Sequence, residues 1–283
     1  MNAGASCVKG NPWTELAIRE VERARDLWAG CQFDAAVRVL REVAPRVPHR
    51  LRFEAIADLA DAIAARHRLD FRQALIPLSR LMGRLPALCD GRDRHGLLEF
   101  VDAARTICDA CSKDTASVTF LCELLDNALR TAGQARFEDA AARLYRVMEM
   151  QGQLWLSEMT DGIFTSGSKP ENAARLPDAL RALEFCQPDE HGDIRLSLEQ
   201  LFLALASLGH DRAKGIAADN ALGKWSRWRP ATEKRNTSIL AHGVLPIGGD
   251  GFNQMKALAK DFLGFDLARE ANPIPTLDPR WVE

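Results

Sequence analysis

The chain has 283 residues, of which 47% are hydrophobic and 27% charged, and its net charge is −2 at neutral pH. This length and composition indicate a soluble protein of one elongated or two compact domains. A net charge so close to zero excludes a uniformly basic protein, so any surface that binds nucleic acid must be local. Leu, Ala, Arg and Glu are abundant and runs of β-branched residues are rare, which predicts an all-α fold.

The first half of the chain has the sequence pattern of helical hairpins. Three short turns are each followed by Phe-x-x-Ala at the start of an amphipathic segment, beginning at Phe33, Phe71 and Phe137. In such hairpins the aromatic ring fills the turn and the alanine lets two helices approach closely. The three openings are not evenly spaced, which argues against a regular solenoid. We therefore expect tetratricopeptide-like hairpins in the N-terminal part.

Helical periodicity continues toward the C-terminus. Helices are expected at 13–30, 33–46, 50–68, 71–85, 93–112, 117–133, 137–159, 173–185, 195–209, 212–223 and 252–263. Another is expected from Ala231 to His242, because Pro230 suits a helix start and Gly243 suits a left-handed cap. Breaks in the pattern predict three regions, which are a hairpin region at 1–114, a second helical domain at 115–263 and a C-terminal tail at 264–283.

No segment of the sequence indicates secretion or membrane insertion. Residues 1–13 lack an apolar core of signal-peptide length, and the longest apolar stretch, 198–208, is too short to span a bilayer. The seven cysteines have no regular spacing and predict reduced thiols. Cys108-x-x-Cys111 lacks a second pair of ligands, so buried thiols are favoured over zinc. We expect a cytoplasmic protein with no membrane contact, no metal and no cofactor.

The residues best suited to chemistry lie between Arg235 and His242. The two are seven positions apart, and because two helical turns take about 7.2 residues they project from one face of the expected helix. Asn236 follows the arginine, and Ser238 lies between the two. A cation that holds phosphate, beside a group that titrates near neutrality, suits phosphodiester cleavage without a metal. The alternative is a surface arginine and a capping histidine.

A local basic stretch precedes this motif. Four basic residues alternate with two tryptophans, in the order Lys224, Trp225, Arg227, Trp228, Arg229 and Lys234. Such a stretch can follow a phosphate backbone and stack unpaired bases, as proteins that bind single-stranded RNA do. The alternative is that both indoles pack inside a hairpin and the charges are solvated.

Two segments resemble a known family. Residues 233–243, Glu-Lys-Arg-Asn-Thr-Ser-Ile-Leu-Ala-His-Gly, are similar to the C-terminal HEPN ribonuclease domain of CRISPR-associated type III accessory proteins. Residues 135–150, which contain Glu149, resemble the other helical signature of that family. The Phe33 and Phe71 hairpins resemble the part that precedes the nuclease, so the resemblance covers most of the chain. It implies tetratricopeptide-like hairpins followed by a HEPN-type helical bundle at 115–263.

The resemblance implies metal-independent cleavage of single-stranded RNA in antiviral defence, at a site shared across a dimer. Arg235 is expected to bind the non-bridging phosphate oxygens and His242 to protonate the departing 5′-oxygen. Supporting roles are expected for Asn236, Ser238 and Glu149, which can orient the histidine or the phosphate. Typical members also carry a nucleotide-sensing CARF domain, for which this sequence has no βαβ pattern. We therefore expect a homodimer or a heteromer with a regulatory partner.

Two other functions fit the same sequence. A HEPN toxin ribonuclease, held inactive by an antitoxin partner, would use identical chemistry, so gene neighbours or a pull-down would be needed to separate it from a CRISPR-linked enzyme. A non-catalytic helical adaptor would use its hairpins to bind protein. In an adaptor, Arg235 and His242 would be salt-bridged or buried instead of facing an open cleft.

Overall fold

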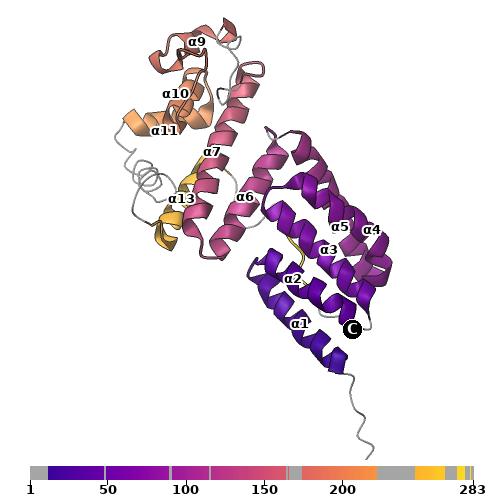
Figure 1. Ribbon diagram of the computed structural model, residues 1–283. Helices are drawn as coiled ribbons and strands as arrows, with labels where there is room; N and C mark the ends of the chain where they lie inside the picture. Colours follow the sequence, from indigo (N-terminus) through magenta and orange to yellow (C-terminus); the bar gives the residue numbers. More distant parts are fainter. Residues whose placement is uncertain are drawn as a thin grey trace, which may run out of the picture. The chain divides into compact units, whose positions relative to one another are not determined.

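A computed structural model describes residues 12–47, 49–88, 91–114, 116–163, 165, 174–221, 246–264, 273–277 and 281. Throughout this part of the chain the regular elements are helices, with no strand, which confirms the predicted all-α fold (Figure 1). The chain divides into two compact units. Met1–Asp114 together with Ile274–Glu283 is termed the hairpin unit, and Thr115–Pro273 the bundle unit.

The hairpin unit consists of helices that pack against their neighbours in sequence (Figure 1). They are α1 (Pro12–Ala29), α2 (Phe33–Val43), the 3₁₀ helix η1 (Ala44–Arg46), α3 (Arg50–His67), α4 (Phe71–Leu88) and α5 (Gly91–Lys113). Helix α3 packs against both α2 and α4, and Ile56, Leu59 and Ile63 on it are almost completely buried. Burying each such side chain stabilises the fold by about 1.5–3 kcal/mol. This arrangement confirms the predicted tetratricopeptide-like hairpins.

Three of the turns between helices have the same backbone geometry. The residue two positions before each predicted phenylalanine is left-handed, since Cys31, Leu69 and Ala135 have φ angles of 55°, 61° and 57°. The next N–H then returns to a carbonyl five residues earlier, as Gln32 N does to Leu27 O at 2.7 Å. A left-handed residue with such a return bond is a common way to end a helix.

The Phe-x-x-Ala openings at Phe33 and Phe71 pack as the sequence predicts, whereas the Phe137 side chain is only half-buried. Phe33 and Phe71 are only 3% and 4% exposed, and Ala36 and Ala74 are completely buried. The Phe33 ring also meets Trp28 of α1 edge to face, with centroids 5.8 Å apart. The aromatic ring therefore fills the turn, while the small alanine side chain allows close packing of the helices.

The C-terminal segment belongs to the hairpin unit. Trp28 Nε1 on α1 donates a hydrogen bond to Pro275 O at 2.9 Å, across 247 positions of sequence. Leu277 and Trp281 of the same segment are buried. Residues near both ends of the chain therefore share one hydrophobic core.

The bundle unit is organised around one long helix, α7 (Phe137–Met159), shown in magenta in Figure 1. Around it are α6 (Val118–Gly133), α9 (Asp178–Arg181), the 3₁₀ helix η2 (Glu184–Cys186), α10 (Leu198–Ser207), α11 (Asp211–Ala221) and α13 (Gly249–Leu263). Helix α7 packs against α6, α10 and α13, and α11 packs against α10. Among the described residues, no helix is long and apolar enough to cross a membrane.

The structure corrects the helix that the sequence predicts at 173–185. In the described part of that range, helical geometry is limited to residues 174–175, to α9 (Asp178–Arg181) and to η2 (Glu184–Cys186). Pro177 precedes α9 with extended backbone, at φ −56° and ψ 148°, and a proline disfavours helical geometry in the residue before it. The helix expected from Ala231 to His242 lies outside the described residues.

Candidate functional site

The predicted site residues divide into one that the structure describes and ten that it does not. Glu149 lies on α7. Outside the described residues are Lys224, Trp225, Arg227, Trp228, Arg229, Lys234, Arg235, Asn236, Ser238 and His242. The described chain stops at Ala221, the end of α11, and resumes at Pro246 before α13.

The chain that follows the predicted motif is attached to the start of α7. Ile247 is buried, and its N–H donates to Glu138 Oε1 at 3.2 Å. In the first turn of α13, the Phe252 ring packs against Phe137, and the two ring centroids are 6.2 Å apart. The motif segment is therefore followed directly by residues that pack on the helix carrying Glu149.

Glu149 lines an open pocket of about 300 Å³ in the bundle unit. The other lining residues come from α7, the segment after it, the loop before α10 and α10 itself, and are Arg146, Gln153, Thr165, Arg195, Leu196 and Leu201. Glu149 is half-buried, and Arg146 Nη1 donates to its Oε2 at 3.2 Å. The pocket thus combines a carboxylate, two guanidinium groups and an apolar wall, a mixture that suits a polar ligand with an apolar face.

The floor of this pocket is fixed by neutral hydrogen bonds. Gln153 is 7% exposed, and its Nε2 donates to Thr165 Oγ1 at 2.7 Å. In return Thr165 N donates to Gln153 Oε1 at 2.9 Å. Because buried polar groups are costly when unpaired, this reciprocal pair holds the segment after α7 against the helix.

A glycine allows α10 to approach the same face of α7. A Cβ atom at Gly152 would lie 2.5 Å from Leu201 Cδ2 and 3.1 Å from its Cγ, both shorter than ordinary contacts. Leu201 is 1% exposed, so it has little room to move. Gly152 therefore sets the distance between α7 and α10 at the pocket.

Arg195 reaches the pocket from a loop that is ordered around Asp189. Asp189 Oδ1 accepts hydrogen bonds from His191 N at 2.9 Å and Asp193 N at 3.0 Å. These backbone bonds, first that of Asp193 and then that of His191, lower the pKa of Asp189 below its usual range. Arg195 Nη2 donates to Asp193 Oδ2 at 3.1 Å, so the loop limits where the guanidinium can point.

Helix α6 carries a buried polar face that the sequence analysis missed. Its members recur at helical spacing and are at most 4% exposed, namely Glu123, Asp126, Asn127, Arg130 and Thr131. Charged side chains are almost never fully buried unless they are paired, and each of the first four makes a further polar or ring contact. In the sequence, these polar residues recur every three or four positions on an otherwise apolar helix, and this pattern indicates the face.

His210 was also missed by the sequence analysis. It precedes α11, where its Nδ1 accepts a hydrogen bond from Ala213 N at 3.4 Å. Its ring packs on Trp155 of α7, with centroids 4.4 Å apart. Burial lowers the pKa of His210, against the opposing effect of the neighbouring Asp211 carboxylate. His210 therefore favours the neutral form and serves as a helix cap.

The described residues hold no group of three or more His, Cys, Asp or Glu side chains that is arranged to bind a metal ion. Cys108 and Cys111 are both buried, as the sequence predicts.

The family model for the Csm6 HEPN domain matches residues 110–266, more than half of the 283-residue chain. The chain belongs to this CRISPR-associated family. The Csm6 HEPN match includes α6, α7, α10, α11 and α13, together with all the predicted site residues. HEPN domains are generally ribonucleases. The chain matches no curated protein.

Proposed function

We propose that this chain is a metal-independent endoribonuclease of CRISPR-linked antiviral defence that cleaves single-stranded RNA. The observation that carries the proposal is that the Csm6 HEPN match includes the whole segment from Arg235 to His242. This segment supplies a phosphate-binding cation and a group that transfers protons near neutral pH. The described helices that flank it in sequence, α11 and α13, both belong to the bundle unit.

RNA brings its own nucleophile to this reaction. The 2′-hydroxyl attacks the adjacent phosphorus and loses its proton to water, and the bond from phosphorus to the 5′-oxygen breaks. Arg235 neutralises the non-bridging oxygens as negative charge develops on them. The His242 imidazolium donates a proton to the departing 5′-oxygen. The products are a 2′,3′-cyclic phosphate and a 5′-hydroxyl.

The remaining predicted residues support this chemistry. Asn236 and Ser238 orient the histidine or the phosphate, and Glu149 supplies a carboxylate from α7. Six residues of the basic stretch hold the RNA strand by charge and by stacking, namely Lys224, Trp225, Arg227, Trp228, Arg229 and Lys234. Glu149 fits its role because it is half-buried at an open pocket of the bundle unit.

The active species is proposed to be a dimer formed through the bundle unit, or a heteromer with a similar chain. One Arg–His pair holds a phosphate weakly at physiological salt, because exposed charges are screened within about 8 Å. Two pairs that face one cleft double the cationic charge and exclude water. Light scattering over a concentration series, run beside the cleavage assay, tests this. A strictly monomeric protein with full specific activity would rule out a shared cleft.

Cleavage of a labelled single-stranded RNA in excess chelator tests the reaction itself. We expect the wild-type chain to produce cyclic-phosphate ends and to leave an all-deoxy strand intact. Arg235→Ala and His242→Ala are each expected to reduce the rate by roughly a thousandfold, as losses of transition-state stabilisation do.

Two surface variants serve as controls for these substitutions. Arg181→Ala and His191→Ala remove an arginine and a histidine that are 54% and 72% exposed in the same unit, and both are expected to keep full activity. Wild-type cleavage by either motif variant would contradict the mechanism. The absence of any RNA cleavage by the wild-type chain would favour the adaptor function.

A further inference from the structure

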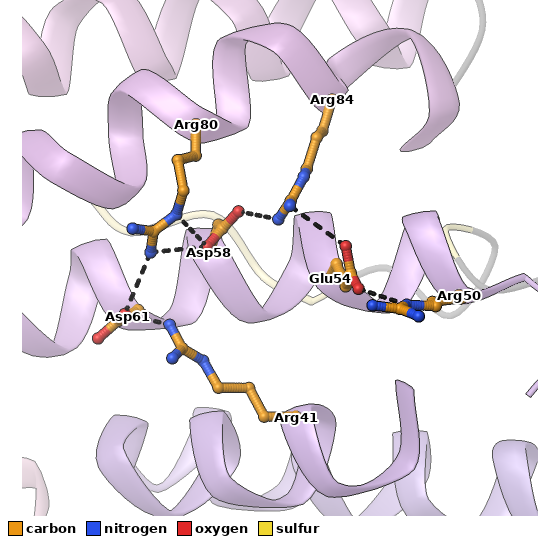
Figure 2. A network of polar contacts seen from close by, with 7 residues as sticks. All are labelled: Arg41, Arg50, Glu54, Asp58, Asp61, Arg80 and Arg84. Carbon is orange, nitrogen blue, oxygen red and sulfur yellow. Dashed lines mark hydrogen bonds and ion pairs between the residues drawn. The ribbon is translucent and has the colours of Figure 1, made fainter. Parts of the chain in front are cut away.

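A second pocket, in the hairpin unit, is lined by charged side chains from three helices. Figure 2 shows Arg80 and Arg84 extending from α4 to Asp58 on α3. Arg80 donates to Asp58 Oδ1 through Nε at 3.0 Å, and its Nη2 lies 2.9 Å from the same oxygen. Arg84 Nη1 donates to Asp58 Oδ2, and its Nη2 lies 3.2 Å from Glu54 Oε2.

The opposite wall of the pocket is formed by α2. Arg41 extends from that helix and forms an ion pair with Asp61 on α3 (Figure 2). The pocket has a volume of about 330 Å³ and is lined by Arg41, Ala44, Pro45, Glu54, Ala57, Asp58, Arg80 and Arg84. Two partners just outside this lining, Asp61 and Arg50, pair with Arg41 and Glu54. The network in Figure 2 therefore has four guanidinium groups and three carboxylates, which leaves one positive charge in excess.

The arginines of this pocket are held in place with donors to spare. The Asp58 side chain is only 5% exposed, whereas those of Arg80, Arg84 and Arg41 are 42%, 32% and 50% exposed. A guanidinium has five N–H donors. Within the described part of the chain, Arg80 Nη1 and Arg84 Nε make no hydrogen bond, and Arg41 uses only Nη2. The donors left over belong to both walls of the pocket.

Stability alone is a poor reason for this arrangement. A buried ion pair loses about as much free energy in desolvation as it gains in attraction, so apolar residues would hold α3 and α4 together equally well. A buried carboxylate that fixes two arginine forks is instead what a preorganised anion site requires. Because donors come from two opposite walls, the site fits a tetrahedral oxyanion better than a planar carboxylate, whose two oxygens one arginine satisfies.

We infer that the pocket formed by Arg41, Arg80 and Arg84 binds a phosphate group, and that RNA supplies this phosphate. The choice of RNA rests on the proposed function. The pocket then holds the strand at the hairpin unit, separately from the motif that cleaves it. Its apolar lining of Ala44, Pro45 and Ala57 leaves room beside the phosphate for part of the nucleotide.

Binding of a short fluorescein-labelled single-stranded RNA tests this inference. The background is the His242→Ala variant of the full chain, so that the measurement does not depend on cleavage. Arg41→Gln removes a donor without exposing Asp58, and Pro45→Glu adds a negative charge at the pocket wall. Each is expected to weaken binding roughly five- to tenfold and to lower the slope of log Kd against log salt by about one.

Arg68→Gln is the matched control for Arg41→Gln. The Arg68 side chain is 47% exposed and forms one ion pair between helical elements, with Asp34, as Arg41 at 50% does with Asp61. Arg68 lies outside the pocket. Its substitution by Gln is expected to change the affinity for RNA by less than about twofold. In a second arm, inorganic phosphate should raise the melting temperature of the wild type relative to chloride of equal ionic strength, and Arg41→Gln should abolish this rise.

The outcomes distinguish a failure of the phosphate-pocket inference from a failure of the proposed function. Equal effects of Arg41→Gln and Arg68→Gln, or no effect of either, would overturn the phosphate pocket and leave the cleavage proposal standing. If the RNA does not bind even the His242→Ala background, the RNA assignment and the proposed function are overturned together. The experiment with inorganic phosphate then still decides whether the pocket binds phosphate. A polyglutamate peptide that binds more tightly than RNA, through Arg41, would assign the pocket to an acidic protein segment instead.

Discussion

The hairpin unit and the bundle unit build their pockets from polar groups in opposite ways. In the hairpin unit, arginines on α4 are fixed by the buried carboxylate of Asp58. In the bundle unit, the buried groups under the pocket are the neutral Gln153 and Thr165. The arginines of that pocket, Arg146 and Arg195, have side chains that are 54% and 72% exposed.

This difference separates a preorganised site from an adaptable one. Guanidinium groups fixed by a buried acid lose little conformational freedom when a ligand arrives. Exposed arginines held only by surface ion pairs contribute little to stability and must be ordered by the ligand. We therefore expect the charges of the hairpin pocket to matter for the fold as well as for binding, and those of the bundle pocket to matter for binding alone.

The largest expected effect comes from Asp58→Ala. Removing this carboxylate leaves Arg80 and Arg84 close together without their shared partner, and we expect the free energy of unfolding of the hairpin unit to fall by about 3 kcal/mol. Hydrogen exchange of peptides from α3 and α4 measures the loss within that unit. Asp61→Ala, at a carboxylate that is 32% exposed, is the control and should cost less than about 1 kcal/mol. Similar losses for the two variants would mean that the buried carboxylate stabilises the hairpin unit no more than an exposed one does.

Gly152→Ala tests whether the close approach of α7 and α10, and not charge, determines the shape of the bundle pocket. Its Cβ would overlap Leu201, and overpacking of this kind costs about 1–3 kcal/mol. The double variant Gly152→Ala, Leu201→Ala should lose less free energy of unfolding than the two single variants together, because the smaller side chain at 201 relieves the overlap. Gly133→Ala meets no atom within 4 Å and should leave urea unfolding nearly unchanged. Additive losses in the double variant would mean that Gly152 has another role.

A smaller effect is expected at the turns, which both units share. Ala135 holds a left-handed conformation at φ 57°, whereas Gly209 occupies the corresponding place before α11 at φ 98°. Ala135→Gly should therefore stabilise the bundle unit by about 0.5 kcal/mol, and Gly209→Ala should destabilise it by about 1 kcal/mol. Thermal denaturation shows whether each variant is more or less stable than the wild type. A loss of stability in Ala135→Gly would count against strain at this turn.

The smallest effects concern acid, which should weaken the bundle unit at a higher pH than the hairpin unit. The pKa of His210 is lowered from 6.5 by burial, so its contribution is complete above pH 6.5 and is lost as pH falls through the folded pKa. The pKa of Glu54 is lowered from 4.5, first by its hydrogen bond from Arg50, so its contribution is lost only below pH 4.5.

Hydrogen exchange at pH 7.5 and 5.5 tests this order. His210→Gln should reduce the loss of bundle protection between these two pH values, and should leave peptides of α3 and α4 unchanged. An unchanged pH response of the bundle unit in this variant would show that other groups cause it.

Local sequence patterns predicted much of the fold. The Phe-x-x-Ala openings identified the hairpins because each depends on residues within one turn. The helix predicted at 173–185 was wrong because Pro177 disfavours helical geometry in the residue before it and so interrupts the helix there. The attachment of Pro275 to Trp28 left no local signal, since the two residues are 247 positions apart.

The candidate site was predicted less completely. Glu149 was found because it lies in a segment that resembles a known signature, whereas Thr165 and Arg195 come to the same pocket from other segments. No periodicity within one helix brings such residues together. The buried face of α6 is different, because its polar residues recur at helical spacing and this pattern is present within one segment of the sequence.

The contact between Trp28 and Pro275 has a consequence for the order in which the chain is made. Residues are added from the N-terminus, so α1 to α5 emerge from the ribosome early, but Leu277 and Trp281, which complete their core, emerge only after the whole bundle unit. The bundle unit can therefore fold while the hairpin unit still exposes apolar surface around Trp28. During synthesis this apolar surface therefore stays uncovered until residues 277–281 have been made and can pack on it.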